Sequence, residues 1–190
     1  MNIEEAIYKR RTIRRFKQDP IPRDILKKLI DYARVAPVGS NIQSLEFIIV
    51  ESHDMRQKLF PLVKWASSLP KEKRAPESGR EPMAYIIVLV NTDIKKFYVD
   101  FDVGAAVENI LLGAISYGIG TCWMGSIKGI KIKKLLEIPE NYEIKHVISL
   151  GYPDETSILE PFEGSFKYWK EGNEMHVPKR KLDEILIKIV

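Results

Sequence analysis

The stretch that decides the fold spans residues 100–117 and reads DFDVGAAVENILLGAISY. Its apolar side chains recur at the spacing of an α-helix and surround nearly the whole circumference. Helices of this kind lie at the centre of a fold or in a contact between subunits. Gly118 and Gly120 come next, and glycine commonly ends a helix. We therefore expect a long central helix with apolar positions Val103, Ala106, Val107, Ile110, Leu111, Ala114 and Ile115.

Apolar runs on both sides of this helix predict strands, and amphipathic runs predict further helices. The strands are expected at residues 45–50, 84–90, 121–125 and 144–150. The helices are expected at residues 3–10, 22–35, 54–63, 128–136 and from residue 182 on, where Leu182, Ile185, Leu186 and Ile189 share one side. Because helices and strands intermingle, the fold class is α/β or α+β. No linker divides the chain, so we expect one domain over residues 1–190.

Residues 66–83 show no periodicity and are rich in Ser, Pro, Lys, Arg and Glu. One interpretation is a solvated loop. The other is a mobile cover over a ligand pocket, because long loops are often functional.

Composition limits the function classes. The net charge of +4 is mildly basic, which suits an anionic ligand but is too weak to indicate nucleic-acid binding. The single cysteine, Cys122, cannot form an intrachain disulfide and is typical of a reduced intracellular protein. The three histidines lack zinc spacing, so no metal site is predicted. Neither a signal peptide nor an apolar run of about 18 residues is present, so we expect a cytoplasmic protein.

Residues 10–16, Arg-Arg-Thr-Ile-Arg-Arg-Phe, follow the first expected helix and crowd four guanidinium groups together. This is either a solvated basic turn or a phosphate site, since the planar guanidinium fork suits phosphate oxygens. In an extended segment Arg10, Thr12 and Arg14 point to one side and Arg15 to the other. We therefore expect the first three to face a ligand and Arg15 to lie on the surface.

Two more segments suit a flat heterocycle. Residues 36–43 end a helix and then offer the amides of Asn41 and Gln43, which either belong to a turn and strand edge or match a flavin pyrimidine ring. Gly125 follows Met124 and is either a turn glycine or a place where backbone N–H groups approach a flat ring. An N–H directed at the flavin N5 atom would stabilise charge that develops there.

Other candidates are weaker. Residues 178–181, Pro-Lys-Arg-Lys, are expected at the start of the last helix, where cations oppose the helix dipole unless they face an anion. No Gly-x-Gly-x-x-Gly or Walker loop supports a nucleotide site of those kinds. Cys122 has no nearby histidine and is not expected to be a nucleophile. Asp100 and Asp102 are interpreted as residues that cap a helix start.

Together these segments resemble the nitroreductase family of flavoproteins. The resemblance covers nearly the whole chain and rests on six motifs in the family's order: Arg10-Arg11-Thr12-x-Arg14-x-Phe16, Ala36-Pro37-x-x-x-Asn41-x-Gln43, Gly104–Leu112, Gly118-x-Gly120-x-x-Trp123-x-Gly125, Gly151-Tyr152-Pro153 and Pro178-Lys179-Arg180. The chain has Pro37-Val38-Gly39 where the family commonly has Pro-Ser-Ser, and Ser44-Leu45 where it usually has Pro-Trp. Contacts to the ring edge are expected to differ there.

The resemblance implies an α+β fold with a central, mostly antiparallel sheet flanked by helices. It also implies a homodimer with an extensive helical interface and FMN between the subunits. On this basis Arg10, Arg11 and Thr12 bind the phosphate and ribityl end of FMN, Lys179 with Arg180 or Lys181 binds the phosphate, and Arg14 lies toward the pyrimidine. Met124 and Gly125 contact N5 and O4. The other FMN-binding residues are Pro37, Val38, Gly39, Asn41 and Gln43, and the first four of these come from the partner subunit.

The implied reaction passes hydride from NADH or NADPH through FMN N5 to a nitroaromatic, a quinone or another flat electrophile. No catalytic side chain is expected, because the cofactor supplies the chemistry. Trp65 and residues 66–83 would line the acceptor side, and Lys64, Arg74 and Arg80 are candidates for a mid-chain cation that larger members supply. The alternatives are reductive dehalogenation or flavin processing on the same fold, a non-enzymatic flavin or phospholigand sensor, and a basic nucleic-acid binder.

Overall fold

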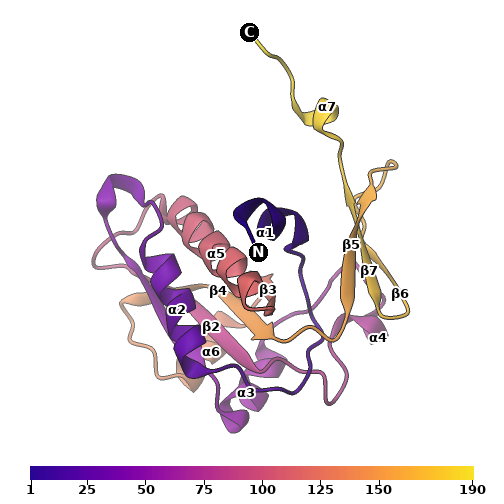
Figure 1. Ribbon diagram of the computed structural model, residues 1–190. Coiled ribbons are helices and arrows are strands. Elements are labelled where there is room, and N and C mark those ends of the chain that lie inside the picture. The colour runs from indigo at the N-terminus through magenta and orange to yellow at the C-terminus, as the bar shows by residue number, and fades with distance from the viewer.

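The computed structural model describes residues 1–190 (Figure 1). Its helices are α1 (Ile3–Lys9), α2 (Arg23–Arg34), α3 (His53–Leu59), α4 (Lys71–Arg74), α5 (Val99–Ser116), α6 (Gly129–Leu135) and α7 (Leu182–Ile185), with short 3-10 helices η1 (Gly39–Asn41) and η2 (Phe60–Leu62). Its strands are β1 (Leu45–Val50), β2 (Ala84–Asn91), β3 (Gly120–Met124), β4 (Tyr142–Gly151), β5 (Thr156–Pro161), β6 (Trp169–Glu171) and β7 (Glu174–Lys179).

The main sheet has the order β1-β2-β4-β3, and every neighbouring pair is antiparallel. Strand β2 is buried on both faces, which explains its uninterrupted apolar sequence. Successive side chains of a strand point to opposite faces, so β2 divides its residues between two apolar cores. The expected α+β fold with an antiparallel sheet flanked by helices is confirmed.

Helices α2 and α5 cover one face of the sheet. The core on this side combines their apolar stripes with Ile86, Val88 and Val90 of β2. The predicted central helix is therefore confirmed, and its buried residues include Val103, Ala106, Val107, Ile110, Leu111 and Ala114. Helix α5 is not buried on every side, because Phe101 remains 79% exposed.

The segment α3, η2 and α6 covers the opposite face. Tyr85, Ile87 and Leu89 of β2 face this second core, together with Cys122 and Met124 of β3. None of the helices is long and apolar enough to cross a lipid bilayer.

A second, three-stranded sheet of order β5-β7-β6 stands beside the main body (Figure 1). Strand β5 runs parallel to β7, and β6 runs antiparallel to it. Ala66 and Leu69 pack on Met175 of β7, which fixes the start of the 66–83 segment to this sheet. That segment is therefore more than a solvated loop, and it includes the one-turn helix α4.

The expectation of an amphipathic last helix is wrong. Helix α7 has four residues, and Leu182, Ile185, Leu186 and Ile189 are all exposed on a chain end that extends away from the body (Figure 1). A short helix needs tertiary packing for its stability, and nothing in this chain packs on α7. Pro178 and Lys179, expected at the start of that helix, belong to strand β7 instead.

Candidate functional site

The arginine segment leaves helix α1 at a defined point. Asn2 caps the start of α1 by accepting a hydrogen bond from the Glu5 N–H, and Arg10 ends the helix in an extended conformation. The chain then runs beside β3, where the Ile13 N–H donates to the Thr121 carbonyl (N···O 2.9 Å). Since this stretch is extended, consecutive side chains alternate between two sides, as the sequence predicts.

The arginine segment borders a small polar cavity of about 160 Å³ that we call the anion pocket, and the long side chain of Arg11 reaches it as well as those of Arg10, Thr12 and Arg14. Four of its residues come from the arginine segment and three from the second sheet or its loop. Its lining residues are Arg10, Arg11, Thr12, Arg14, Tyr168, Val177 and Lys179. The expected grouping of Arg10, Arg11, Thr12 and Lys179 is therefore observed, and Arg14 lies in the same pocket.

The pocket is strongly cationic. Arg10 reaches a carboxylate at its edge, with its Nε 3.4 Å from Glu108 Oε1. Arg11 donates to the Tyr8 carbonyl at the end of α1 (N···O 2.6 Å), and burial together with the neighbouring charge of Arg10 lowers its pKa. Arg14 and Lys179 form no salt bridge, and the Nε of Arg14 is buried without a hydrogen-bond partner.

Arg15 lies on the opposite side, and the expectation that it is a surface residue is wrong. Its side chain is only 1% exposed. Its Nε donates to Glu77 Oε2 (2.8 Å), and its Nη2 donates to the backbone carbonyls of Lys73 and Ala75. Burial alone lowers the pKa of Arg15, but the hydrogen bond with Glu77 and the charge of Glu155 outweigh it and raise the pKa. The 66–83 segment covers this side, and that cover buries the guanidinium.

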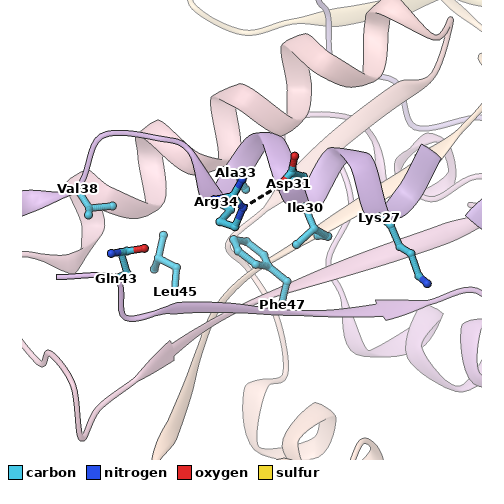
Figure 2. Close-up of a pocket in the computed structure, with 9 residues that line it drawn as sticks. All are labelled: Lys27, Ile30, Asp31, Ala33, Arg34, Val38, Gln43, Leu45 and Phe47. Atoms are coloured by element: carbon cyan, nitrogen blue, oxygen red, sulfur yellow. Dashed lines mark hydrogen bonds and ion pairs between the residues drawn. The ribbon is translucent and has the colours of Figure 1, made fainter. Parts of the chain in front are cut away.

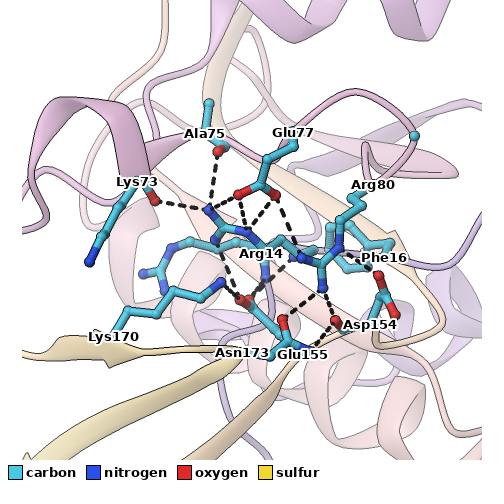
Figure 3. Close-up of polar contacts among 12 residues, drawn as sticks. Arg14, Phe16, Lys73, Ala75, Glu77, Arg80, Asp154, Glu155, Lys170 and Asn173 are labelled. Carbon is cyan, nitrogen blue, oxygen red and sulfur yellow. Dashed lines mark hydrogen bonds and ion pairs between the residues drawn. The ribbon is translucent and has the colours of Figure 1, made fainter.

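Glu155 joins the two sheets at this point (Figure 3). Its side chain is fully buried, and its Oε1 accepts hydrogen bonds from the backbone N–H groups of Arg14 (2.6 Å) and Arg15 (3.3 Å). Its Oε2 accepts from Lys170 Nζ (2.9 Å) on strand β6. A single carboxylate therefore fixes the backbone of the arginine segment against the second sheet.

The 37–43 segment follows helix α2 and is attached to helix α5 through Asp102. Gly39 donates its N–H to Asp102 Oδ1 (2.9 Å), and Lys95 Nζ lies 2.5 Å from Asp102 Oδ2. Asp102 thus ties this turn to α5 in addition to lying in the first helical turn. Asn41 is exposed and has a positive φ of 56°, a conformation that asparagine tolerates.

Val38 and Gln43 line a separate cavity of about 440 Å³ between α2 and the edge strand β1 (Figure 2). This cavity is lined mainly by apolar side chains, including Ile30, Leu45 and Phe47. It shares no lining residue with the anion pocket. One chain therefore does not bring the 37–43 segment together with the arginine segment.

Met124 and Gly125 lie at the end of β3. Met124 is buried in the second core, whereas Gly125 is exposed. A Cβ atom at Gly125 would lie 3.2 Å from Nδ1 and Cε1 of His146, so the imidazole packs against this glycine. Burial lowers the pKa of His146, which keeps the ring neutral at pH 7.

Arg180 and Lys181 do not line the anion pocket. Arg180 lies beside Glu184, with its Nε 3.8 Å from Glu184 Oε2, and the Lys181 N–H donates to the same carboxylate (2.9 Å). The chain turns away from the pocket after β7, so only Lys179 of the basic 178–181 segment reaches it.

A sequence model of the Nitroreductase family matches residues 7–152. The chain belongs to the nitroreductase family. The match includes the arginine segment, the 37–43 segment and strand β3 with Gly125, and it ends before the second sheet. The resemblance inferred from the six motifs is confirmed.

Relatives support the same assignment. The chain is 33% identical over 164 residues to a protein of Archaeoglobus fulgidus with the provisional name NADH dehydrogenase/NAD(P)H nitroreductase, covering 82% of this chain and 88% of that protein. It is 24% identical over 173 residues to the NADPH-flavin oxidoreductase of Vibrio harveyi, covering 84% and 69%. The crystal structure of a nitroreductase family protein from Clostridium novyi NT matches with a TM-score of 0.70 and 33% identity, covering 81% and 86%.

Within this nitroreductase-family fold, several residues expected near an acceptor have structural roles. Trp65 is buried in the second core and packs on Phe60, with ring centroids 5.5 Å apart. Arg74 donates to the Leu69 carbonyl (2.7 Å), and Arg80 Nε lies 2.5 Å from Asp154 Oδ2.

Lys64 is exposed, and its N–H donates to the Ser126 carbonyl (2.9 Å), one residue after Gly125. Among the three mid-chain cations considered, Lys64 is therefore the one near the end of β3. Cys122 is buried, and burial raises the pKa of its thiol, as expected for a structural cysteine.

Sequence reasoning missed Tyr168, Val177 and Glu155. Tyr168 lies beside the three-residue strand β6, and Val177 lies on β7, whose burial does not alternate with period 2. Glu155 follows the Gly151-Tyr152-Pro153 motif, and a lone glutamate beside an aspartate gives no sequence signal of burial.

Proposed function

We propose that this chain passes hydride from NADH or NADPH through FMN to a nitroaromatic, a quinone or a similar flat electrophile. The anion pocket carries the proposal, because four cationic side chains and no carboxylate line it. The broader expectation of an FMN-dependent NAD(P)H oxidoreductase is confirmed by family membership and by relatives named NAD(P)H nitroreductase and NADPH-flavin oxidoreductase. The acceptor and the route of the hydride are proposed here.

The residues present fit the phosphate of FMN. Arg10, Arg11 and Lys179 place positive charge around one small cavity. Thr12 adds a hydroxyl donor. Charge-assisted hydrogen bonds of this kind contribute about 1.5–3 kcal/mol each. Arg14 lines the same cavity and keeps the place that the family resemblance implies, toward the pyrimidine.

Strand β3 connects this pocket to Gly125. Thr12 pairs with Thr121 at one end of β3, and Gly125 follows its other end, about 13 Å away at the rise of a β-strand. Bound FMN would accept hydride at N5 and deliver the electrons to the acceptor. The backbone of Met124 and Gly125 is the proposed contact for N5 and O4, and the neutral His146 ring supports Gly125 from behind.

The separation of the two pockets supports a homodimer with FMN between subunits. In this proposal Pro37, Val38, Gly39, Asn41 and Gln43 contribute to the cofactor site of the second subunit. Exposed apolar side chains on α1 and at the start of α5 are available for the contact; they are Ile3, Ile7, Tyr8 and Phe101. The single domain over 1–190 and the cytoplasmic location stay predictions.

The first experiment is the visible absorption spectrum of the purified protein, followed by anaerobic addition of NADH and of NADPH. Flavin bands that bleach with either nucleotide support the proposal. Bands that bleach with neither indicate another electron donor. A colourless protein that also fails to bind added FMN contradicts the proposal.

Two substitutions test the assignment of the pocket. Arg10→Ala and Arg14→Ala should weaken FMN binding without lowering the melting temperature of the apoprotein by more than a few degrees. Arg23→Ala is the matched control, because Arg23 is 73% exposed and pairs with Glu51 far from the pocket. Stoichiometric FMN in both pocket variants would refute the assignment. A monomer that retains FMN at micromolar concentration would refute the shared site.

A further inference from the structure

The residue that faces Gly125 across the sheet is His146. Strands β3 and β4 are antiparallel and pair Met124 with Val147, so the next position along β3 lies opposite His146. Facing residues of an antiparallel pair project to the same side of the sheet. A Cβ atom at Gly125 would lie 3.2 Å from Nδ1 and Cε1 of the imidazole. The ring therefore occupies the space that a side chain at residue 125 would take.

Strand β4 is irregular at this point. Val88 of β2 pairs with His146 and Leu89 pairs with Ile144, so Lys145 is an extra residue in β4. Such a bulge redirects neighbouring side chains and is over-represented next to active sites. The irregularity therefore lies directly beside the proposed contact for N5 and O4.

The imidazole is packed on more than one side. The Trp123 ring meets it edge to face, with ring centroids 5.2 Å apart. The charged groups that act on it are Asp100 of α5 and Lys145 of β4, and these two pair with each other at 3.6 Å. Lys145 also pairs with Glu143 at 2.9 Å. A proton added to His146 would thus place a second positive charge beside Lys145.

We propose that His146 is a positioning residue that, as a neutral ring, fixes the Met124–Gly125 backbone at the ring system of FMN and releases it when protonated; this rests on the proposed function. Burial lowers the pKa of the imidazole, and it outweighs the Met124 backbone and Asp100, which favour the protonated form. The contact with Gly125 is therefore complete above about pH 6.5 and is lost as the pH falls through the lowered pKa. Hydrogen bonds from the freed backbone then weaken, because they depend on its orientation.

The test measures dissociation constants of the apoprotein for FMN and for riboflavin by quenching of flavin fluorescence, between about pH 5 and pH 8. Riboflavin isolates the ring system, because it lacks the phosphate, whose own pKa lies near about 6. The wild type should bind riboflavin about 2- to 10-fold more weakly once His146 is protonated, the loss of about one hydrogen bond. An NMR titration of the apoprotein gives the pKa of His146 itself.

His146→Asn keeps a flat polar side chain that does not titrate, so its riboflavin affinity should not depend on pH. His146→Gln is a second variant with the same expected result, so the test does not depend on one substitution folding. His53→Asn is the matched control, because His53 is exposed at the start of α3. This control should keep the pH dependence of the wild type.

Three results would overturn the inference. One is a wild-type riboflavin affinity that does not change with pH, and another is a pH dependence that survives in both His146 variants. The third is an ordinary or raised pKa for His146. In each case the flavin still binds, so the proposed function stands. Failure of the wild type to bind either flavin at any pH would instead refute the proposed function, and this inference with it.

Discussion

The buried carboxylate of Glu155 provides a sharp test of how the site is held together. Its side chain is fully buried and lies among Arg15, Lys170 and the backbone N–H of Arg14, at distances of 2.6–3.4 Å. The substitution Glu155→Gln keeps the shape and one carbonyl acceptor but removes the negative charge. Lys170, whose side chain is 6% exposed, then has no carboxylate partner.

Removing one partner of a buried ion pair costs about 3–5 kcal/mol, because the remaining charge stays desolvated. We expect the lower end, about 3 kcal/mol, since Arg15 keeps its hydrogen bonds to Glu77. For a chain of this length, each kcal/mol lowers the melting temperature by about 2–4 °C, so the expected shift is roughly 6–12 °C.

Thermal unfolding followed by circular dichroism, at equal protein concentration, measures this shift. Glu140→Gln is the matched control, because Glu140 pairs with Lys133 at 2.9 Å while its side chain is 99% exposed. An exposed pair of this kind contributes about 0–1 kcal/mol, so the control should melt within about 4 °C of the wild type. Equal melting temperatures for Glu155→Gln and the wild type would refute the structural role of the carboxylate.

Three further changes have definite expected outcomes. Gly151→Ala places a Cβ 2.7 Å from the Cβ of the buried Phe16, so urea unfolding should show a loss of about 1–3 kcal/mol; wild-type stability would contradict the close packing. The hydrogen bond with Glu160 raises the pKa of His176 in the folded protein. The protonated His176 therefore stabilises the fold fully below about pH 6.5, and this stabilisation is lost as the pH rises through the raised pKa. An NMR titration that finds an ordinary or lowered pKa for His176 would disprove this. The hydrogen bond from Arg15 lowers the pKa of Glu77 to about 2. The Glu77 carboxylate therefore stabilises the fold above about pH 4.5, and this stabilisation is lost as the pH falls toward 2. Glu77→Gln should make the free energy of unfolding less dependent on pH between these values, and an unchanged dependence counts against the pair.

The sequence predicted the main body well because strong apolar periodicity marks its elements. Strand β1 occupies the predicted residues 45–50, and α5 begins and ends within one residue of the prediction. These segments bury one or both faces, so their patterns are determined by the core. The same reasoning failed for β5–β7, since β5 and β6 bury no residue and the two buried residues of β7, Met175 and Pro178, do not follow period 2.

The case of Arg15 shows where local reasoning ends. The alternation of an extended segment correctly separates Arg14 from Arg15. It does not reveal that residues from 73 to 77 and residue 155 cover the side on which Arg15 lies. Likewise, Lys179 reaches the anion pocket from a strand that the sequence presented as a helix start. Contacts between distant parts of the chain decide both positions.

The anion pocket joins residues 10–14 to residues 168–179. Every buried residue of the two main cores lies between residues 21 and 150. During translation, a nascent chain can therefore collapse around both cores before β7 has left the ribosome, while half of the pocket is still missing. Closing a loop of this length adds little entropy cost beyond that of a shorter one, so late docking of β7 carries only a small penalty. A chain that ends before β7 therefore retains every residue of the two main cores but lacks Val177 and Lys179 of the pocket.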